Sequence, residues 1–225
     1  MGRRVLSLDW DWFTGDRGDG DGCCGWSCSY SNNRGRGTID CEPPETESDE
    51  GIPIIPRSVS LRTCAILQDV QRVGVLVVAE CHGSLAALIQ DGDEIHHLDA
   101  HHDGAEYDPN GDYPREGRVT CGNWVTVVRR WHKGVTVTHL PDETYRRPDG
   151  VWCNGVDNMG ILSLHPEYDL VFVCKSSPWT PKSLDIDLHR LIKYLAARCP
   201  TGIRWYGHRA RELRKEHARL LPEGV

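Results

Sequence analysis

The sequence lacks any apolar run long enough to cross a bilayer, so no membrane-spanning helix is predicted. Only four residues separate Met1-Gly-Arg-Arg from Asp9, which leaves no room for a signal peptide there. The ten cysteines include no paired Cys-x-x-Cys, and without a leader they favour reduced thiols and a cytoplasmic location. The net charge of −7 argues against nucleic acid as a general partner.

What the sequence does contain describes an ordinary globular domain. Its 225 residues are 39% hydrophobic and 26% charged, enough to bury a substantial core in one domain spanning 1–225. Alternating strand and helix patterns predict an α/β fold with a mostly parallel sheet and helices on both faces, in three layers. The expected strands cover 5–13, 73–79, 94–98, 135–140 and 170–174, and the expected helices cover 60–71, 85–89, 125–131, 182–197 and 209–221.

Residues 14 to about 50 differ in composition from the rest of the chain. Gly, Asp, Ser, Asn, Arg and Glu dominate, with almost no apolar periodicity, which predicts a long loop inserted after the first strand. Cys23, Cys24, Cys28 and Cys41 fall within it, but their spacing matches no zinc ribbon or knuckle.

Candidate metal ligands follow the expected strands. Asp99, His101 and Asp103 occupy alternate positions, which in an extended backbone would leave on one face. By the same period, Asp9 and Asp11 would share one face of the first strand and the intervening tryptophans the other. Mixed oxygen and nitrogen donors of this kind suit hard or borderline divalent cations.

A third candidate ligand, His82, follows the strand predicted over 73–79. In an open parallel sheet, groups at the carboxyl ends of strands meet at one edge. Four carboxylates and two imidazoles exceed the needs of one zinc ion and suit two cations with bridging carboxylates. Mn²⁺ is then the natural occupant, although Zn²⁺ or Fe²⁺ could bind in vitro. Asp185 and Asp187 form a rival pair, but on a helix they point about 200° apart and instead favour its positive end.

These motifs carry a resemblance to a known family. His82, the run Asp99-Ala-His101-His-Asp103 and an Asp-x-Asp pair resemble the ligand set of the arginase and agmatinase superfamily. In that family the Asp-x-Asp follows the other motifs, whereas here it precedes them. The closer resemblance is to small arginase-like proteins that include the peptide arginases of ribosomal-peptide biosynthesis. It rests on residues 8–13, 80–82, 99–103 and 122–124.

The resemblance implies an arginase-like three-layer catalytic domain with two Mn²⁺ ions. Its ligand sets would be His82, Asp99, Asp103 and Asp9 for one ion, and Asp99, His101, Asp9 and Asp11 for the other. The reaction implied is hydrolysis of arginine residues in a precursor peptide, giving ornithine residues and urea. The absence of the loops that grip a free amino acid favours arginine presented on a peptide. The basic helix at 209–221 is either a solvated face or a docking surface for an acidic peptide.

One departure from the family leaves catalytic roles open. Free-arginine arginases carry Gly-Asn-x-His where this chain has Gly122-Asn123-Trp124-Val125, so the proton-shuttle histidine is missing. The candidates to replace it are His102, His132 and His139. Glu80, and after it Glu106, are the candidates to grip the guanidinium. The alternatives are hydrolysis of a small guanidino or acylamino compound, and a metal-stabilised peptide-binding protein without catalysis.

Overall fold

The computed structural model describes residues 2–14, 27–33, 36–42, 67–99, 103–104, 119, 121–140, 158–159, 164–176, 180, 184–207 and 209–221. The strands are β1 (Arg4–Asp9), β2 (Ser27–Asn33), β3 (Arg36–Glu42), β4 (Arg72–Ala79), β5 (Glu94–Leu98), β6 (Thr136–Leu140), β7 (Asn158–Met159), β8 (Glu167–Cys174) and β9 (Ile203–Tyr206). The helices are α1 (Trp10–Thr14), the 3₁₀-helix η1 (His82–Ala87), α3 (Trp124–Trp131), α4 (Asp185–Ala196) and α5 (Ala210–Leu220).

The main sheet confirms the predicted α/β class. Seven strands pair in the order β7-β6-β5-β1-β8-β4-β9, and each neighbouring pair is parallel. The central strand β1 lies between β5 and β8, so three carboxyl ends from distant parts of the sequence become neighbours. Among the described helices, none is long and apolar enough to cross a membrane.

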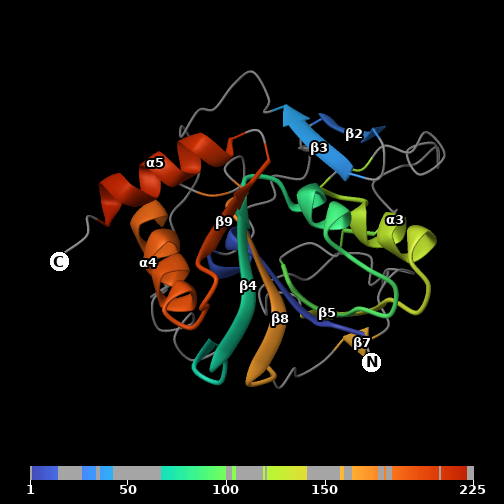
Figure 1. The fold of residues 1–225 in the computed structure, drawn as a ribbon, viewed down its shortest axis with the longest axis horizontal. Helices are drawn as coiled ribbons and strands as arrows, with labels where there is room; N and C mark the ends of the chain where they lie inside the picture. Colours follow the sequence, from blue (N-terminus) through green and yellow to red (C-terminus); the bar gives the residue numbers. More distant parts are fainter. Residues whose placement is uncertain are drawn as a thin grey trace, which may run out of the picture.

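Strand alternation divides the core into two clusters, one on each face of the sheet. On one face, Val5 and Phe172 belong to a cluster with Val128 of α3 and residues of η1. On the other face, Leu6 packs in a cluster with Leu188 of α4 and with aromatic residues of α1. Figure 1 shows α3 and α4 on opposite sides of the strands, which gives the three layers expected from the sequence.

Several predicted boundaries were wrong. The first strand ends at Asp9 and the chain turns into α1, because Trp10, Trp12 and Phe13 all bury in the same cluster as α4. Asp9 and Asp11 therefore do not share a strand face. The helix predicted to reach 71 ends at Leu67, and its residues 60–66 lie outside the description.

The helix predicted over 182–197 starts later than expected. It begins at Asp185, with Leu184 at the N-cap and no side-chain cap. Thr180, which precedes this helix, donates its hydroxyl to the carbonyls of Lys175 and Ser176. The basic helix predicted over 209–221 is confirmed, since α5 spans Ala210–Leu220.

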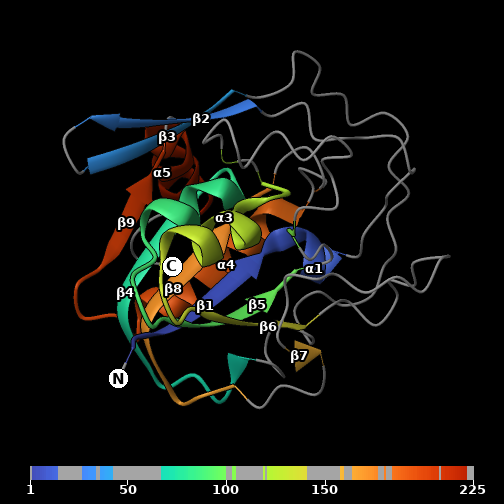
Figure 2. The same cartoon turned by 90° about the vertical axis from the view of Figure 1, so that its right-hand side faces the viewer.

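The predicted insertion at 14–50 contains regular structure in its described part. β2 and β3 form an antiparallel two-stranded sheet, with Tyr30 opposite Ile39. Figure 2 shows this hairpin outside the main sheet, and β3 lies against η1. The expectation of loop throughout was therefore wrong for these two strands, because hairpin pairing needs no apolar periodicity over a long window.

Candidate metal centre

Polar side chains replace apolar ones where four adjacent strands end. The change occurs on the face covered by η1 and α3, the face that holds Val5 and Val137 nearer the strand starts. The register aligns Ser7 with His97, His97 with His139, and Asp9 with Cys174. All five of these residues are buried. A buried row of ionisable groups at the carboxyl edge of a parallel sheet is where a ligand site is expected.

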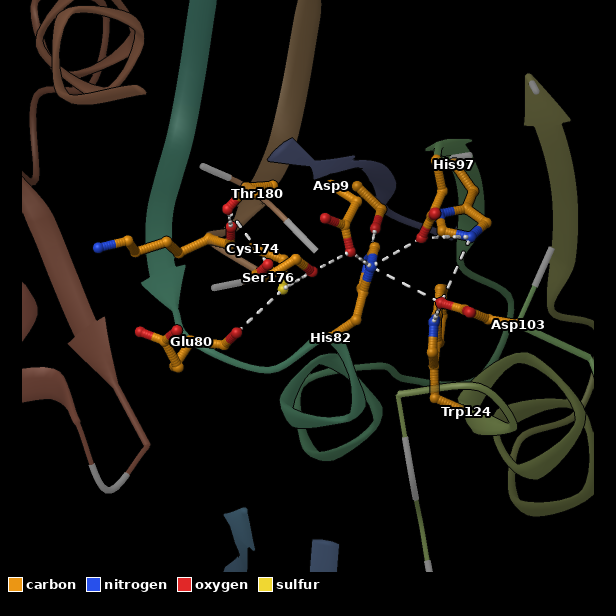
Figure 3. Close-up of polar contacts among 12 residues, drawn as sticks. Asp9, Glu80, His82, His97, Asp103, Trp124, Cys174, Ser176 and Thr180 are labelled. Carbon is orange, nitrogen blue, oxygen red and sulfur yellow. Dashed lines mark hydrogen bonds and ion pairs between the residues drawn. The ribbon is translucent and has the colours of Figure 1, made fainter. Parts of the chain in front are cut away.

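His82 lies at the centre of this row, at the start of η1 (Figure 3). Its Nδ1 is 2.8 Å from a carboxylate oxygen of Asp9, 3.0 Å from one of Asp99 and 3.6 Å from one of Asp103. Its other nitrogen, Nε2, lies 2.5 Å from Ser7 Oγ. Three carboxylates therefore surround Nδ1 of His82, and the contact between Nε2 and Ser7 fixes the orientation of the ring.

The charge balance of the cluster depends on that imidazole. Burial lowers the pKa of His82, but hydrogen bonds and charges from Asp9 and Asp99 outweigh it and raise the pKa well above its usual value. In the protein alone, an imidazolium proton thus lies where the three carboxylates converge. A divalent cation bound there would take the place of that proton and supply more positive charge.

Second contacts orient the carboxylates. Ser176 Oγ donates to Asp9 Oδ2 at 2.7 Å, and the indole Nε1 of Trp124 donates to Asp103 Oδ2 at 2.6 Å. His139 Nε2 donates to the backbone carbonyl of Asp99 at 2.9 Å. Such outer contacts hold ligating groups in place in metal sites.

Backbone strain is concentrated at the same place. In the described part of the chain, the non-glycine residues with left-handed φ are Asp103 at 53° and Ser176 at 50°. This conformation costs about 1–2 kcal/mol for a residue with a Cβ. Residues held in sparsely populated backbone regions cluster at functional sites, and both of these act on the same cluster.

Two further groups add potential ligands. His97 Nε2 lies 3.4 Å from Asp99 Oδ2 and 3.7 Å from Asp103 Oδ2, and its ring meets that of Trp124 edge-on. The Cys174 thiol lies close enough to Asp9 and His82 for one ion to contact all three. Burial is the main reason that the pKa of this thiol is raised, and Sγ donates to the carbonyl of Glu80.

The donor set fits a divalent cation. Asp9, Asp99 and Asp103 direct oxygen atoms at the nitrogen of His82, all four residues are buried, and oxygen with imidazole is the donor mixture that Mn²⁺ or Zn²⁺ accepts. Only the first of the two ligand sets implied by the resemblance lies wholly within the described side chains. The second set also needs Asp11, whose backbone lies in α1 but whose side chain is outside the description, and His101, which is outside it altogether.

The convergence of Asp99 and Asp103 does not arise in the predicted way. β5 ends at Leu98, and the left-handed φ of Asp103 breaks the extended alternation assumed for the run. Both carboxylates nevertheless reach His82.

The remaining candidate residues are dispersed. Glu80 is buried, but in Figure 3 its carboxylate points away from His82, and its carbonyl makes the contact with Cys174. His132 pairs with Asp91 beyond the end of α3, whereas His139 donates to the backbone carbonyl of Asp99. His102 and Glu106 lie outside the described residues.

Sequence reasoning missed several residues that shape the site. Ser7 and His97 could have been found, because each lies two positions before a predicted ligand on its strand and so shares that ligand's face. Ser176 gave no such signal, since its contact with Asp9 joins segments 167 residues apart. Trp124 belongs to the stretch 122–124 that carries the resemblance, but its contact with Asp103, 21 residues away, was not predicted. Comparisons with known protein families, with curated proteins and with solved structures find no match for this chain.

Proposed function

We propose that the chain is a metal-dependent hydrolase that converts arginine residues of a peptide to ornithine residues, releasing urea. The observation that carries this proposal is the buried convergence of Asp9, Asp99 and Asp103 on His82 Nδ1. The resemblance of the motifs to those of arginase-like proteins supplies the reaction class.

The proposed cofactor is a pair of Mn²⁺ ions. His82, Asp9, Asp99 and Asp103 would hold the first ion, and Asp9, Asp99, Asp11 and His101 would hold the second. Bound divalent ions of this kind supply a water-derived nucleophile near neutral pH, suited to attack on a guanidinium carbon.

The chain's own groups would prepare the site for that chemistry. Ser176 and Trp124 hold the carboxylates of Asp9 and Asp103 in fixed orientations, and Ser7 holds the His82 ring. Burial by α3 and η1 limits water around these charges, so each electrostatic contact is stronger than it would be at the surface.

A charged hollow beyond the end of β8 supports a substrate larger than free arginine. It has a volume of about 440 Å³, and its lining includes Lys175, Asp185, Glu216, Arg209 and Arg219. Lys175 directly precedes Ser176 in the sequence, and the Ser176 hydroxyl donates to Asp9. Exposed cations continue along α5 at Arg211, Arg214 and Lys215. The exposed cations of α5 would bind acidic residues that flank the reacting arginine.

A urea assay with Mn²⁺ and arginine-containing peptides tests the proposal. Wild-type protein should release urea and lower the peptide mass by one CH₂N₂ unit per event, and free arginine should react much more slowly. Asp99→Asn should reduce release to the level seen without metal. Asp69→Asn, at an exposed aspartate in the turn before β4, is the matched control and should behave as wild type.

Two results would contradict the proposal. Faster turnover of free arginine than of every peptide would refute the peptide substrate but keep the chemistry. Full activity in Asp99→Asn would refute the metal centre itself.

The nearness of Cys174 to Asp9 and His82 favours a second candidate, a hydrolase of acylated amines with a single zinc. Elemental analysis separates the two. One tightly bound zinc that is lost in Cys174→Ser would support the single-zinc enzyme, and two Mn²⁺ unaffected by that change would support the first proposal.

A further inference from the structure

A second group of metal-ligating side chains lies at the opposite edge of the sheet, where strands begin. Glu94 and His96 occupy alternate positions at the start of β5, so they leave on the same face. His165 belongs to the turn that precedes β8. Since β5 and β8 are the two neighbours of β1, this turn and the start of β5 lie near one another.

The side chains of this group converge. His96 Nε2 lies 3.4 Å from Glu94 Oε1, and His165 Nε2 lies 4.0 Å from the same oxygen. The two imidazole rings are stacked, with their centroids 5.2 Å apart. One ligand atom from each of the three residues lies within 4.8 Å of the others.

Tyr168 fixes the orientation of His96. The tyrosine hydroxyl lies 2.9 Å from His96 Nδ1 and also accepts the backbone N–H of His165 at 3.1 Å. With Nδ1–H donating to the hydroxyl, the Nε2 lone pair of His96 is directed toward Glu94. A hydrogen bond on the second imidazole nitrogen is what orients a metal-bound histidine and sets its tautomer.

We propose that Glu94, His96 and His165 form a divalent-metal site of the Zn²⁺ type. Two imidazoles and one carboxylate are the protein ligands of an open zinc site, whose fourth position takes water. Bonds of about 2.0–2.2 Å at tetrahedral angles place neighbouring donor atoms about 3.3–3.5 Å apart. The separation of 3.4 Å already meets that value, and the separation of 4.0 Å needs a contraction of about 0.5 Å.

The surroundings permit both that contraction and access for water. The Glu94 side chain is 48% exposed and that of His165 is 35% exposed, so both can move, whereas His96 is held in the interior. Glu94 and Tyr168 also border a hollow of about 360 Å³ that is open to solvent. A bound ion would join the start of β5 to the turn before β8. None of these residues belongs to the cluster around His82, so the inference does not depend on the proposed hydrolase activity.

The test is a metal titration of the full chain after removal of metal with a chelator. Zn²⁺ is followed by calorimetry, and Co²⁺ by its visible absorption, which is intense only in tetrahedral sites. Wild-type protein should bind one more equivalent than His165→Ala or Glu94→Gln, and the difference spectrum should be that of tetrahedral Co²⁺. His132→Ala is the control, because this partly buried histidine pairs with Asp91 outside the group. This variant should bind the same number of metal equivalents as wild type.

Tyr168→Phe keeps the packed ring and removes only the hydroxyl. It should bind Zn²⁺ at this site about 10–100-fold more weakly if the hydroxyl orients a ligand. If His165→Ala does not fold, Glu94→Gln decides, because that side chain is half exposed and its replacement preserves the chain's packing. Equal stoichiometry and equal affinity in wild type, Glu94→Gln and Tyr168→Phe would overturn the assignment.

Discussion

Position 176 allows backbone strain and ligand orientation to be measured separately. Ser176 has a φ of 50°, and its hydroxyl donates to the buried carboxylate of Asp9. Ser176→Ala removes the hydroxyl and keeps a Cβ in the left-handed region. Ser176→Gly also removes the hydroxyl but relieves the steric cost of that conformation.

The expected magnitudes follow from these two effects. Loss of a buried hydrogen bond to a charged group costs about 1.5–3 kcal/mol in both variants. Glycine should recover about 1 kcal/mol of this, because the left-handed backbone costs a Cβ-bearing residue about 1–2 kcal/mol. With a typical urea m-value of about 1–3 kcal/mol per molar, the Gly variant should unfold at about 0.3–1 M more urea than the Ala variant.

Urea unfolding with a chelator present measures the strain, and a Mn²⁺ titration measures the orientation. Both variants should bind Mn²⁺ about 10–100-fold more weakly, because the contact that orients Asp9 is gone from each. Gly134→Ala calibrates the strain, since Gly134 is exposed with a φ of 70° and lies far along the chain from Asp9. That variant should lose about 1 kcal/mol of stability with unchanged Mn²⁺ affinity. If Ser176→Ala proves as stable as Ser176→Gly, the strain argument fails.

Two further predictions concern other buried polar contacts. Trp124→Phe should lose about 1–3 kcal/mol of unfolding free energy and about 10–100-fold in Mn²⁺ affinity, because Asp103 loses its indole donor; a titration showing wild-type affinity would contradict the role of Trp124. Burial is the main cause that raises the pKa of Asp185 to about 6, and a hydrogen bond with Glu216 raises it further, whereas the positive charge of Lys175 lowers it. An acid with a raised folded-state pKa weakens the fold as pH rises through that range, so the stability of Asp185→Asn relative to wild type should increase from pH ~4 to ~6.5. Urea unfolding across that range checks the sign, and a constant or falling difference would contradict it.

The alternation of the strands made much of the fold predictable. β4, β5 and β6 follow runs of apolar or alternating residues, and the sequence placed them within one or two residues of their observed bounds. The end of β1 was mispredicted because Trp10 and Trp12 look like alternate strand residues. Both instead turn into the same cluster on the α4 side, a packing preference that overrides local periodicity.

The sequence predicted which residues meet at the candidate site better than it predicted how they are arranged. Asp9 ends β1, Asp99 directly follows β5 and His82 lies three residues after the end of β4, so a parallel sheet brings them to one edge. Their supporting contacts could not be predicted, because Ser176 and Trp124 lie in segments that have no metal-ligating pattern and are distant in sequence from Asp9 and Asp103. The role of Asp185 was also only partly foreseen. It lies in the first turn of α4 as expected, but it accepts a 3.0 Å hydrogen bond from the buried Lys175, which a helix-dipole argument does not predict.

The central strand carries a conflict between stability and function along one of its faces. On this face of β1, Val5 lies in the apolar core, and Ser7 and Asp9 follow it toward the carboxyl end of the strand. Ser7 and Asp9 both contact His82, which also contacts the buried carboxylates of Asp99 and Asp103. Burial of three carboxylates around one imidazole opposes folding unless positive charge accompanies it. A cation that binds only the folded state stabilises that state by mass action, so the proposed metal binding would be coupled to folding. The strained backbone at Asp103 and at Ser176 is held by the side-chain contacts Trp124–Asp103 and Ser176–Asp9, and the proposed cation would stabilise the same carboxylates.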